Sequence, residues 1–428
     1  MRLRNFLSII LALTLMLALL SGCAVAQTAE PVEVVIWHTF TNDQDATLNA
    51  IADAFNASQT AAVVKVQSQP YSGFLGNVQS AVANGVGPNI IFNYASTAAE
   101  YVEEGLVVDI SKYIDDPEVG IPGFKDSLPA GILAEAYGFV DGRMHAWPLV
   151  TTGPILFYNK TLYDELGLAV PTTWSELAAN SKAIFEAKGI PGYGEDSLVD
   201  TIQSLILQSG GGYIDVEAKK VLWNTPEVVE RLEWFVDNVK AGYFSITPVG
   251  DYYSTDYNGG QVGSYGGSCA GVPYIDPIGF ESATAPVPSE GPVDWYPSWN
   301  RGIIIFSANA ADVKAGNQEA VEKASYEFAK FYASTENNAK WCESMVAISP
   351  YAATTEVASY QAFVEQNPAL ADVAANLVHG GTLPNVTGSA VVRTELSKAI
   401  TLAAGGQLTV AEALAEAEQV CNDALQGK

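Results

Sequence analysis

The 428-residue chain has few basic residues. Lys and Arg number 21 against 48 Asp and Glu, which gives a formal net charge of −27. Nucleic acids and anionic lipid surfaces are bound through clusters of Lys and Arg. The acid excess therefore excludes a general nucleic-acid binder and a protein held on a membrane by a basic face. Only 16% of the residues are charged and 48% are hydrophobic, which excludes a disordered polyanion and is enough for large cores. At about 150 residues per domain, the length predicts two to three domain-sized units.

Long hydrophobic runs are missing except near the N-terminus. Residues 6–20 form a 15-residue apolar run behind Arg2 and Arg4, short for a membrane-spanning helix of about 20 residues but typical of an export signal. The run ends in LSGC, which resembles a bacterial lipobox. We therefore predict a lipoprotein signal peptide over residues 1–22, lipidation of Cys23 and a leash over residues 23–31. The alternative is ordinary signal cleavage nearby. Two acyl chains suffice to hold the protein on the extracellular face of the cytoplasmic membrane.

Cysteine and histidine are also scarce. Beyond Cys23 the chain has Cys269, Cys342 and Cys421, an odd number whose spacing fits no metal motif. Three unpaired buried thiols are the simplest interpretation, and one disulfide with one free thiol is the alternative. The three histidines lack the spacing of a metal site. We expect neither a metal nor another cofactor.

Catalytic motifs are absent or incomplete. The segment 266–271 (GGSCAG) approaches the G-x-S-x-G nucleophile motif, but Ala270 stands where its last glycine is needed. No phosphate-binding loop or dinucleotide fingerprint is present. Because spacing alone does not identify a glycosidase carboxylate pair, a secreted carbohydrate-active hydrolase stays open as an alternative. A surface adhesion module is a third, and we expect a protein that is not an enzyme.

Strand and helix patterns alternate along the chain. Val32–Trp37 is a β-branched run, and Leu48, Ile51 and Phe55 then mark one helix face. Such alternation predicts an α/β protein with mostly parallel sheets flanked by helices, in which ligands bind beyond the carboxyl ends of strands. A second block begins near residue 150, and residues 248–300 are rich in Gly, Pro, Tyr and Trp. The expected strands are 32–37, 63–66, 89–92, 106–110, 155–158 and 303–306; the expected helices are 47–58, 74–84, 97–104, 173–189, 226–241, 320–333, 390–403 and 410–425.

Aromatic residues gather after the predicted strands and in the 248–300 segment. Their faces stack on sugar rings while neighbouring hydroxyl and amide groups bind sugar hydroxyls, although any one of them can equally fill a core. They are Trp37, Phe40, Tyr71, Tyr94, Tyr252, Tyr253, Tyr257, Tyr265, Tyr274, Trp295, Tyr296 and Trp299. Arg301 follows them, and its guanidinium can fork onto two oxygens of a carboxylate, phosphate or diol. A structural ion pair is the alternative for Arg301.

Several segments together resemble the extracellular solute-binding proteins of bacterial ABC importers, the group that holds maltose- and glycerol-3-phosphate-binding proteins. The resemblance covers the mature chain and is carried by VVIWHTF, EEGLVVDISKYI, GRMHAWPLVTTGPILFYNKTLYDELGL and VPTTWSEL. It implies a two-lobe, type II periplasmic-binding-protein-like fold with a ligand cleft between the lobes. Lobe 1 would hold residues 32–149 and 302–333, and lobe 2 residues 150–301 and 334–428. The crossings would fall near residues 150–152, 298–302 and 333–337.

The resemblance also implies the function. A monomer would capture a mono- or oligosaccharide by hinge closure and deliver it to a membrane permease. The implied ligand contacts are Thr39, Phe40, Tyr71, Asn93, Tyr94, Thr151, Thr152, Asp200, Ser268, Trp299 and Arg301. Arg301-Gly302 stands where relatives often have Gly-Gly, which makes glycerol 3-phosphate, a glycerophosphodiester or another anionic polyol the alternative ligand. The segment MVAISPYAATTEV lacks the Gly-Tyr pair of glycerol-3-phosphate binders, which weakens that particular ligand.

Overall fold

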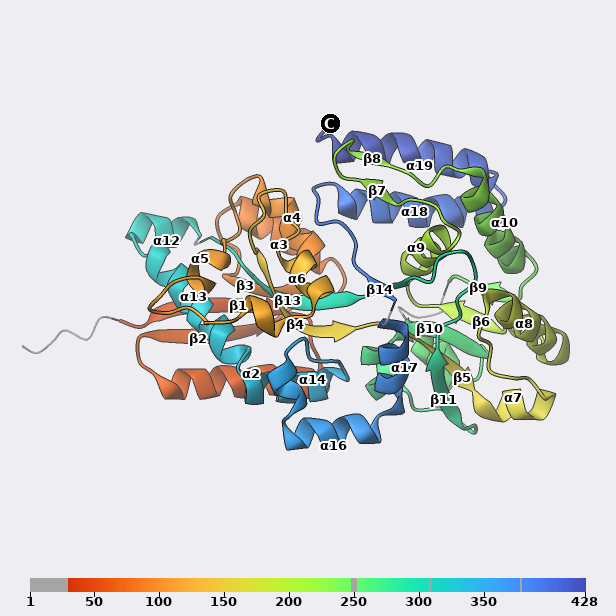
Figure 1. Cartoon of the computed structure of the whole chain (residues 1–428), viewed down its shortest axis with the longest axis horizontal. Coiled ribbons are helices and arrows are strands. Elements are labelled where there is room, and N and C mark those ends of the chain that lie inside the picture. The colour runs from red at the N-terminus through yellow and green to blue at the C-terminus, as the bar shows by residue number, and fades with distance from the viewer. Residues whose placement is uncertain (1–29, 248–251, 308, 378) are drawn as a thin grey trace, which may run out of the picture.

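The computed structural model describes residues 30–247, 252–307, 309–377 and 379–428. Each of two lobes is built on a five-stranded sheet with helices around it (Figure 1). The α/β class and the two-lobe architecture predicted from the sequence are therefore confirmed. The signal peptide, Cys23 and most of the leash lie outside the described residues.

The first sheet has the order β2-β1-β3-β13-β4. Its strands are β1 (Val32–His38), β2 (Ala62–Ser68), β3 (Ile90–Tyr94), β4 (Ala146–Thr152) and β13 (Trp299–Ile305). β1 pairs in parallel with β2 and β3, whereas β13 runs antiparallel between β3 and β4. A strand from late in the chain is thus inserted into the N-terminal sheet, and four of the five strands share one direction.

The second sheet has the order β11-β5-β10-β6-β9. Its strands are β5 (Pro154–Asn159), β6 (Tyr193–Glu195), β9 (Phe244–Ser245), β10 (Ser264–Ser268) and β11 (Ser282–Pro286). β5 is antiparallel to both of its neighbours, and β6 is parallel to β9 and β10. This sheet too is mostly unidirectional. Four two-residue strands complete the set: β7 (Ile214–Asp215), β8 (Lys220–Val221), β12 (Tyr296–Pro297) and β14 (Gly380–Gly381).

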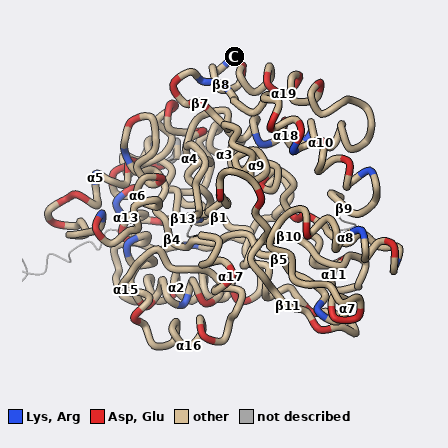
Figure 2. Tube along the Cα trace, turned by 45° about the vertical axis from the view of Figure 1, so that its right-hand side comes forward, with Lys and Arg blue, Asp and Glu red and all other residues tan. Residues whose placement is uncertain are grey.

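Helices cover both sheets, and the acidic residues are spread over both lobes (Figure 2). The helix predicted over 173–189 forms with the capping box that its sequence indicates, since the Thr173 hydroxyl accepts from the Glu176 backbone N–H and the Glu176 carboxylate accepts from the Thr173 N–H. The helices are α2 (Asn42–Ser58), α3 (Phe74–Ala83), α4 (Ala95–Val102), α5 (Ser111–Ile114), η1 (Lys125–Ser127), α6 (Ala130–Ala136), α7 (Lys160–Leu166), α8 (Trp174–Lys188), α9 (Leu198–Gln208), α10 (Pro226–Lys240), α11 (Tyr253–Asn258), η2 (Cys269–Tyr274), α12 (Ala310–Ala315), α13 (Gln318–Tyr332), α14 (Thr335–Met345), α15 (Ala352–Thr355), α16 (Ala358–Gln366), α17 (Pro368–Leu377), α18 (Ser389–Ala404) and α19 (Val410–Leu425).

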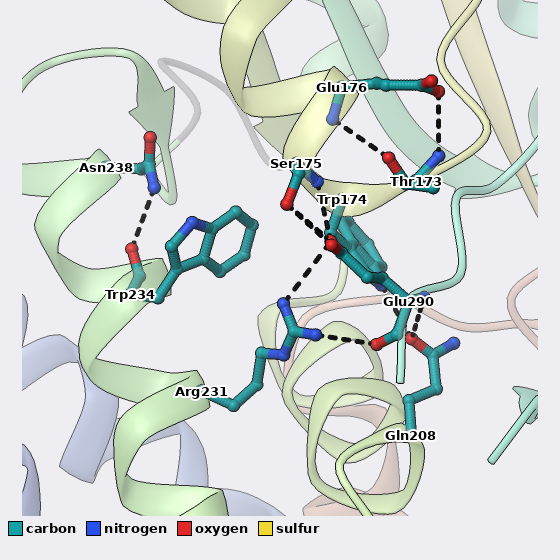
Figure 3. A network of polar contacts seen from close by, with 9 residues as sticks. All are labelled: Thr173, Trp174, Ser175, Glu176, Gln208, Arg231, Trp234, Asn238 and Glu290. Atoms are coloured by element: carbon teal, nitrogen blue, oxygen red, sulfur yellow. Dashed lines mark hydrogen bonds and ion pairs between the residues drawn. The ribbon is translucent and has the colours of Figure 1, made fainter. Parts of the chain in front are cut away.

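A polar network ties the helices of the second lobe to the loop before β12 (Figure 3). Glu290 accepts hydrogen bonds from the backbone N–H and the hydroxyl of Ser175 at the start of α8. Arg231 of α10 donates to the Glu290 backbone oxygen at 2.8 Å and pairs with its carboxylate at 3.7 Å. Trp174 is buried beside this network and donates its indole N–H to Gln208 at 2.7 Å. The arginine of α10 therefore has a structural partner.

The predicted strand over residues 106–110 does not form. The segment makes one isolated bridge, between Val107 and Phe306, and then turns into α5. The turn begins at Asp109, whose carboxylate accepts from the Ser111 backbone N–H at 3.0 Å. This side-chain bond offers the backbone an alternative to a ladder, as Asp commonly does at turns.

The packing of α14 to α16 differs from the predicted lobe boundary. Residues 334–366 were expected in the second lobe, but α14 lies against α2 and places Trp341 and Cys342 in the first-lobe core. Tyr351 fastens this segment to the first sheet, because its hydroxyl accepts from the Trp147 indole N–H at 2.7 Å. The chain therefore changes lobes between α16 and α17, which packs against β5 and β11 of the second sheet. The apolar face of α14 packs into the core of the first lobe, and this packing assigns the helix to that lobe.

The three cysteines among the described residues are free and buried. Cys342 lies in the first-lobe core, Cys421 in the second-lobe core and Cys269 in a separate cluster beside β10. The prediction of three unpaired buried thiols is therefore confirmed, and the alternative of one disulfide is not.

Candidate functional site

Arg301 lies at the carboxyl ends of β1 and β3, on the side of the first lobe that faces the second. Its guanidinium carbon is 5.5 Å from the ring centre of Phe40 and 5.3 Å from that of Tyr94. Phe40 is buried and packs edge-on against Phe92 and Trp341, whereas Tyr94 is half-buried. Phe40 is thus a core residue, and its ring forms part of the surface on which the Arg301 guanidinium lies.

The antiparallel insertion of β13 determines which side chains meet Arg301. In the ladder Arg301 stands opposite Tyr94 on one side and Val150 on the other, and the pairing with β4 shifts between Arg301 and Gly302. Such a bulge re-aims the side chain beside it. Eight of the eleven predicted contacts lie on this first-lobe edge: Thr39, Phe40, Tyr71, Asn93, Tyr94, Thr151, Trp299 and Arg301.

Two pairs of residues approach each other from opposite lobes. Tyr71, after β2, and Tyr252, before α11, have ring centres 6.0 Å apart. Thr41 and Tyr274 share a hydrogen bond of 3.2 Å between their hydroxyl groups. Tyr71 and Tyr252 are still 63% and 43% exposed, so both rings retain accessible faces where the lobes meet.

Two carboxyl groups lie at the carboxyl end of β6 in the second lobe. Glu195 is buried, and its carboxylate accepts from the Tyr193 hydroxyl and the Ser197 backbone N–H. Asp196 accepts from the Tyr253 backbone N–H at 2.7 Å. Burial raises the pKa of Glu195 to about 8 and that of Asp196 to about 6. Both groups lie outside the predicted contacts, although the rule of strand carboxyl ends points directly to Asp196.

A second polar network spans the crossing strands. Asn300 accepts from the Thr151 hydroxyl at 2.7 Å and donates to the Glu135 carboxylate at 2.5 Å. The backbone oxygen of Glu135 accepts from Asn385, at 2.8 Å. Burial raises the pKa of Glu135 to about 7. Residues of α6, β4, β13 and the segment before α18 are thus linked through the half-buried Glu135.

Several predicted contacts are engaged within the chain. Their bonds shape the strand ends: Asn93 accepts from the Tyr94 N–H (2.9 Å), Thr152 donates to the Trp299 oxygen (3.4 Å), and Ser268 accepts from the Ala270 N–H (3.2 Å). Thr39 is half-buried directly after β1, and Trp299 is half-buried at the start of β13. Their role as ligand contacts stays a prediction.

Asp200 forms an ion pair inside the second lobe. Its carboxylate is 2.7 Å from the guanidinium of Arg393 on α18 and accepts from the Ser197 hydroxyl. Asp200 is buried, and about a third of the Arg393 side chain is exposed. The pair joins α9 to α18 within one lobe.

We expect Asp200→Ala to lower the free energy of unfolding by about 2 kcal/mol, because it leaves Arg393 in a partly buried place without its counter-charge. Denaturant unfolding of the purified chain measures this. The control is Asp164→Ala, which removes an exposed pair with Lys160 and should cost about 0.5 kcal/mol or less. Unchanged stability together with lost ligand binding would instead make Asp200 a ligand contact.

No group of His, Cys, Asp and Glu suited to a metal ion occurs within the described parts of the chain. Within the same described parts, no helix is both long enough and apolar enough to cross a membrane.

The inserted antiparallel strand and the two facing lobes define a type II periplasmic-binding-protein-like fold. The family model described as bacterial extracellular solute-binding protein matches residues 50–372. The chain belongs to this family.

Similar proteins support membership of this family. The chain is 25% identical over 396 residues to the sn-glycerol-3-phosphate-binding periplasmic protein UgpB of Yersinia pestis, covering 86% of this chain and 83% of that protein. The cyclic alpha-maltosyl-1,6-maltose binding protein from Arthrobacter globiformis is 24% identical, with a TM-score of 0.74 over 93% of this chain and 100% of that one. The GacH receptor of Streptomyces glaucescens, solved unliganded and with acarbose, is 17% identical, with a TM-score of 0.78 over 92% and 99%. The two structures establish a shared fold.

Proposed function

We propose that this chain is the substrate-binding subunit of an ABC importer and captures an extracellular carbohydrate between its two lobes. The observation that carries the proposal is the contact of Tyr71 with Tyr252 across the lobe interface, where Arg301, which lies against the Tyr94 ring, acts electrostatically on the Tyr252 hydroxyl. Aromatic faces next to hydroxyl, carboxyl and guanidinium groups suit the apolar faces and the hydroxyl rim of a sugar. The relative named for a cyclic maltoside supports a sugar ligand, and the relative named for glycerol 3-phosphate supports the alternative, an anionic polyol.

The mechanism is reversible binding without a chemical step. β4 leads into β5 through the single residue Gly153, and β13 returns to the first sheet, so few backbone torsions separate the lobes. Rotation about these crossings would close the lobes on the ligand, and the closed form would be read by the permease. Eight of the proposed contacts lie on the first-lobe edge, with Thr152 beside them at the crossing, and Asp200 and Ser268 lie in the second lobe.

The anchor and the assembly belong to the same proposal. Cys23 would carry the lipid on the extracellular face of the membrane, and the residues up to 31 would separate the body from the bilayer. The lipobox sequence supports the anchor, and the family supports the permease partner. We propose a monomer, because one pair of lobes supplies both walls of the site.

A thermal-shift screen of the chain from Ala24 onward tests the ligand class. A sugar at 100 times its dissociation constant should stabilise the chain by about 2.7 kcal/mol, and incubation should return the sugar unchanged. Stabilisation by a peptide or a metal ion, with no sugar effective, would refute the carbohydrate ligand, and release of cleaved sugar would favour the hydrolase. Tyr71→Ala should weaken the shift, whereas Val86→Ala, an exposed residue after α3, should not.

A further inference from the structure

The arginines differ in how their charge is compensated. Among the described residues, every arginine except Arg301 has an acidic partner within 4.0 Å. The pairs are Arg143–Asp109 (3.4 Å), Arg231–Glu290 (3.7 Å) and Arg393–Asp200 (2.7 Å). The Nε of Arg301 is buried and has no hydrogen-bond partner in the described chain. Acids outnumber bases by more than two to one here, so an arginine without an acid is the unexpected case.

The surroundings of Arg301 hold its guanidinium in place without neutralising it. The rings of Phe40 and Tyr94 lie 5.5 and 5.3 Å from the guanidinium carbon. Aromatic rings attract the cation through their faces, but they accept no hydrogen bonds in the plane of the guanidinium. A planar fork held in this way is oriented for two oxygens of one carboxylate or phosphate group.

The second lobe faces this cation with a hydroxyl and a carboxyl group. Burial and the neighbouring Tyr71 raise the pKa of the Tyr252 hydroxyl; Asp196 adds to the rise and Arg301 opposes it. Both charged groups therefore act on one hydroxyl at the lobe interface. An anion between the lobes would be attracted by Arg301 and repelled by Asp196, while a sugar hydroxyl can donate to the Asp196 carboxylate.

We propose that Arg301 determines specificity by binding an anionic group of the ligand, so that the sugar taken up is an acidic one, with its carboxylate or phosphate at Arg301 and its hydroxyls toward Asp196. This rests on the proposed capture of a carbohydrate between the lobes. It deepens that function by naming the substrate class. The anionic group of the ligand would supply the negative charge and the hydrogen-bond acceptors in the plane of the guanidinium that no described residue provides for Arg301.

Matched pairs of ligands test the proposal by calorimetric titration of the chain from Ala24 onward. Glucose is compared with glucuronate and with glucose 6-phosphate, and galactose is compared with galacturonate. At least one acidic probe should bind tenfold to a hundredfold tighter than its neutral parent, the range for a charged hydrogen bond. Whether the uronates or the phosphate bind identifies the anionic group. Higher salt should weaken this binding.

The variants locate the effect. Arg301→Gln should lose the preference for the acidic probe and leave binding of the neutral parent little changed, and Arg301→Lys should keep part of it. The control Arg143→Gln removes a largely exposed arginine of the first lobe and should change nothing. Equal or tighter binding of neutral sugars to the unmodified chain overturns the proposal and leaves carbohydrate capture standing. A chain that binds neither kind of sugar overturns both. The comparison on the unmodified chain decides the matter even where Arg301→Gln folds poorly.

Discussion

Gly302→Ala is expected to lower the free energy of unfolding by about 3 kcal/mol or more, the upper range for a forced methyl group in a packed interior. A Cβ at this position would lie 2.0 Å from the carbonyl oxygen of Trp147 and 2.6 Å from its carbonyl carbon. Both atoms belong to the backbone of β4, which is paired with β13 and buried along its whole length. No side-chain rotation relieves the contact, so one of the two strands must shift.

The same close approach has a functional consequence. Gly302 forms the step at which the β13–β4 register shifts, directly after Arg301. A displaced β13 would move the guanidinium away from Phe40 and Tyr94. The residual folded Gly302→Ala protein should therefore bind the sugar ligand more weakly than the unmodified chain.

Urea unfolding, followed by tryptophan fluorescence, measures the effect of Gly302→Ala. The matched control is Gly76→Ala in α3, where a Cβ would meet no atom within 4 Å. There alanine should stabilise by about 0.5–1 kcal/mol, since glycine inside a helix is unfavourable. If Gly302→Ala unfolds at the same urea concentration as the unmodified chain, the backbones of β13 and β4 leave room for a methyl group at residue 302, and the clash inferred from their close approach is wrong.

The elements predicted well are those whose pattern is local. The apolar runs at β1, β3 and β5 and the capping box of α8 place their elements within a few residues of the structure. The error at residues 106–110 has a local cause too, because Asp109 favours the turn into α5 over a strand. The misplaced lobe boundary has a different origin. The apolar face of α14 fits either core, and only tertiary packing assigns it to the first.

In the candidate site too, local sequence patterns predicted some residues, whereas the contacts made by tertiary packing could not be predicted. The rule of strand carboxyl ends predicted Phe40, Tyr71 and Tyr94, which do lie at the first-lobe edge. The pairing of Tyr71 with Tyr252 joins residues 181 positions apart in sequence and depends on how the lobes face each other. The Glu135 network has no sequence signal, because AGILAEA looks like any amphipathic helix and the partner Asn300 is 165 residues away.

Acidification from pH 8 toward pH 5 is expected to stabilise the chain, and Glu135→Gln to remove much of that dependence. Burial raises the pKa of Glu135 to about 7 from an ordinary value of 4.5. Between these values the folded chain holds a proton on Glu135 that the unfolded chain has released. Stability therefore rises as pH falls through about 7 and levels off below about 4.5. Glu195 acts in the same direction, because its pKa is raised to about 8.

Glu135→Gln imitates the protonated carboxyl group and keeps an oxygen to accept from Asn300. At pH 8 it should stabilise the chain by up to about 3 kcal/mol, the energy equivalent of the pKa displacement, and at pH 4.5 its effect should nearly vanish. Thermal unfolding at several pH values measures both. Glu356→Gln, an exposed acid on the first lobe, serves as the control for the loss of one negative charge from a highly acidic chain. A variant that is less stable than the unmodified chain at pH 8 would mean that the ionised carboxylate, held by Asn300, is the form that the crossing strands require.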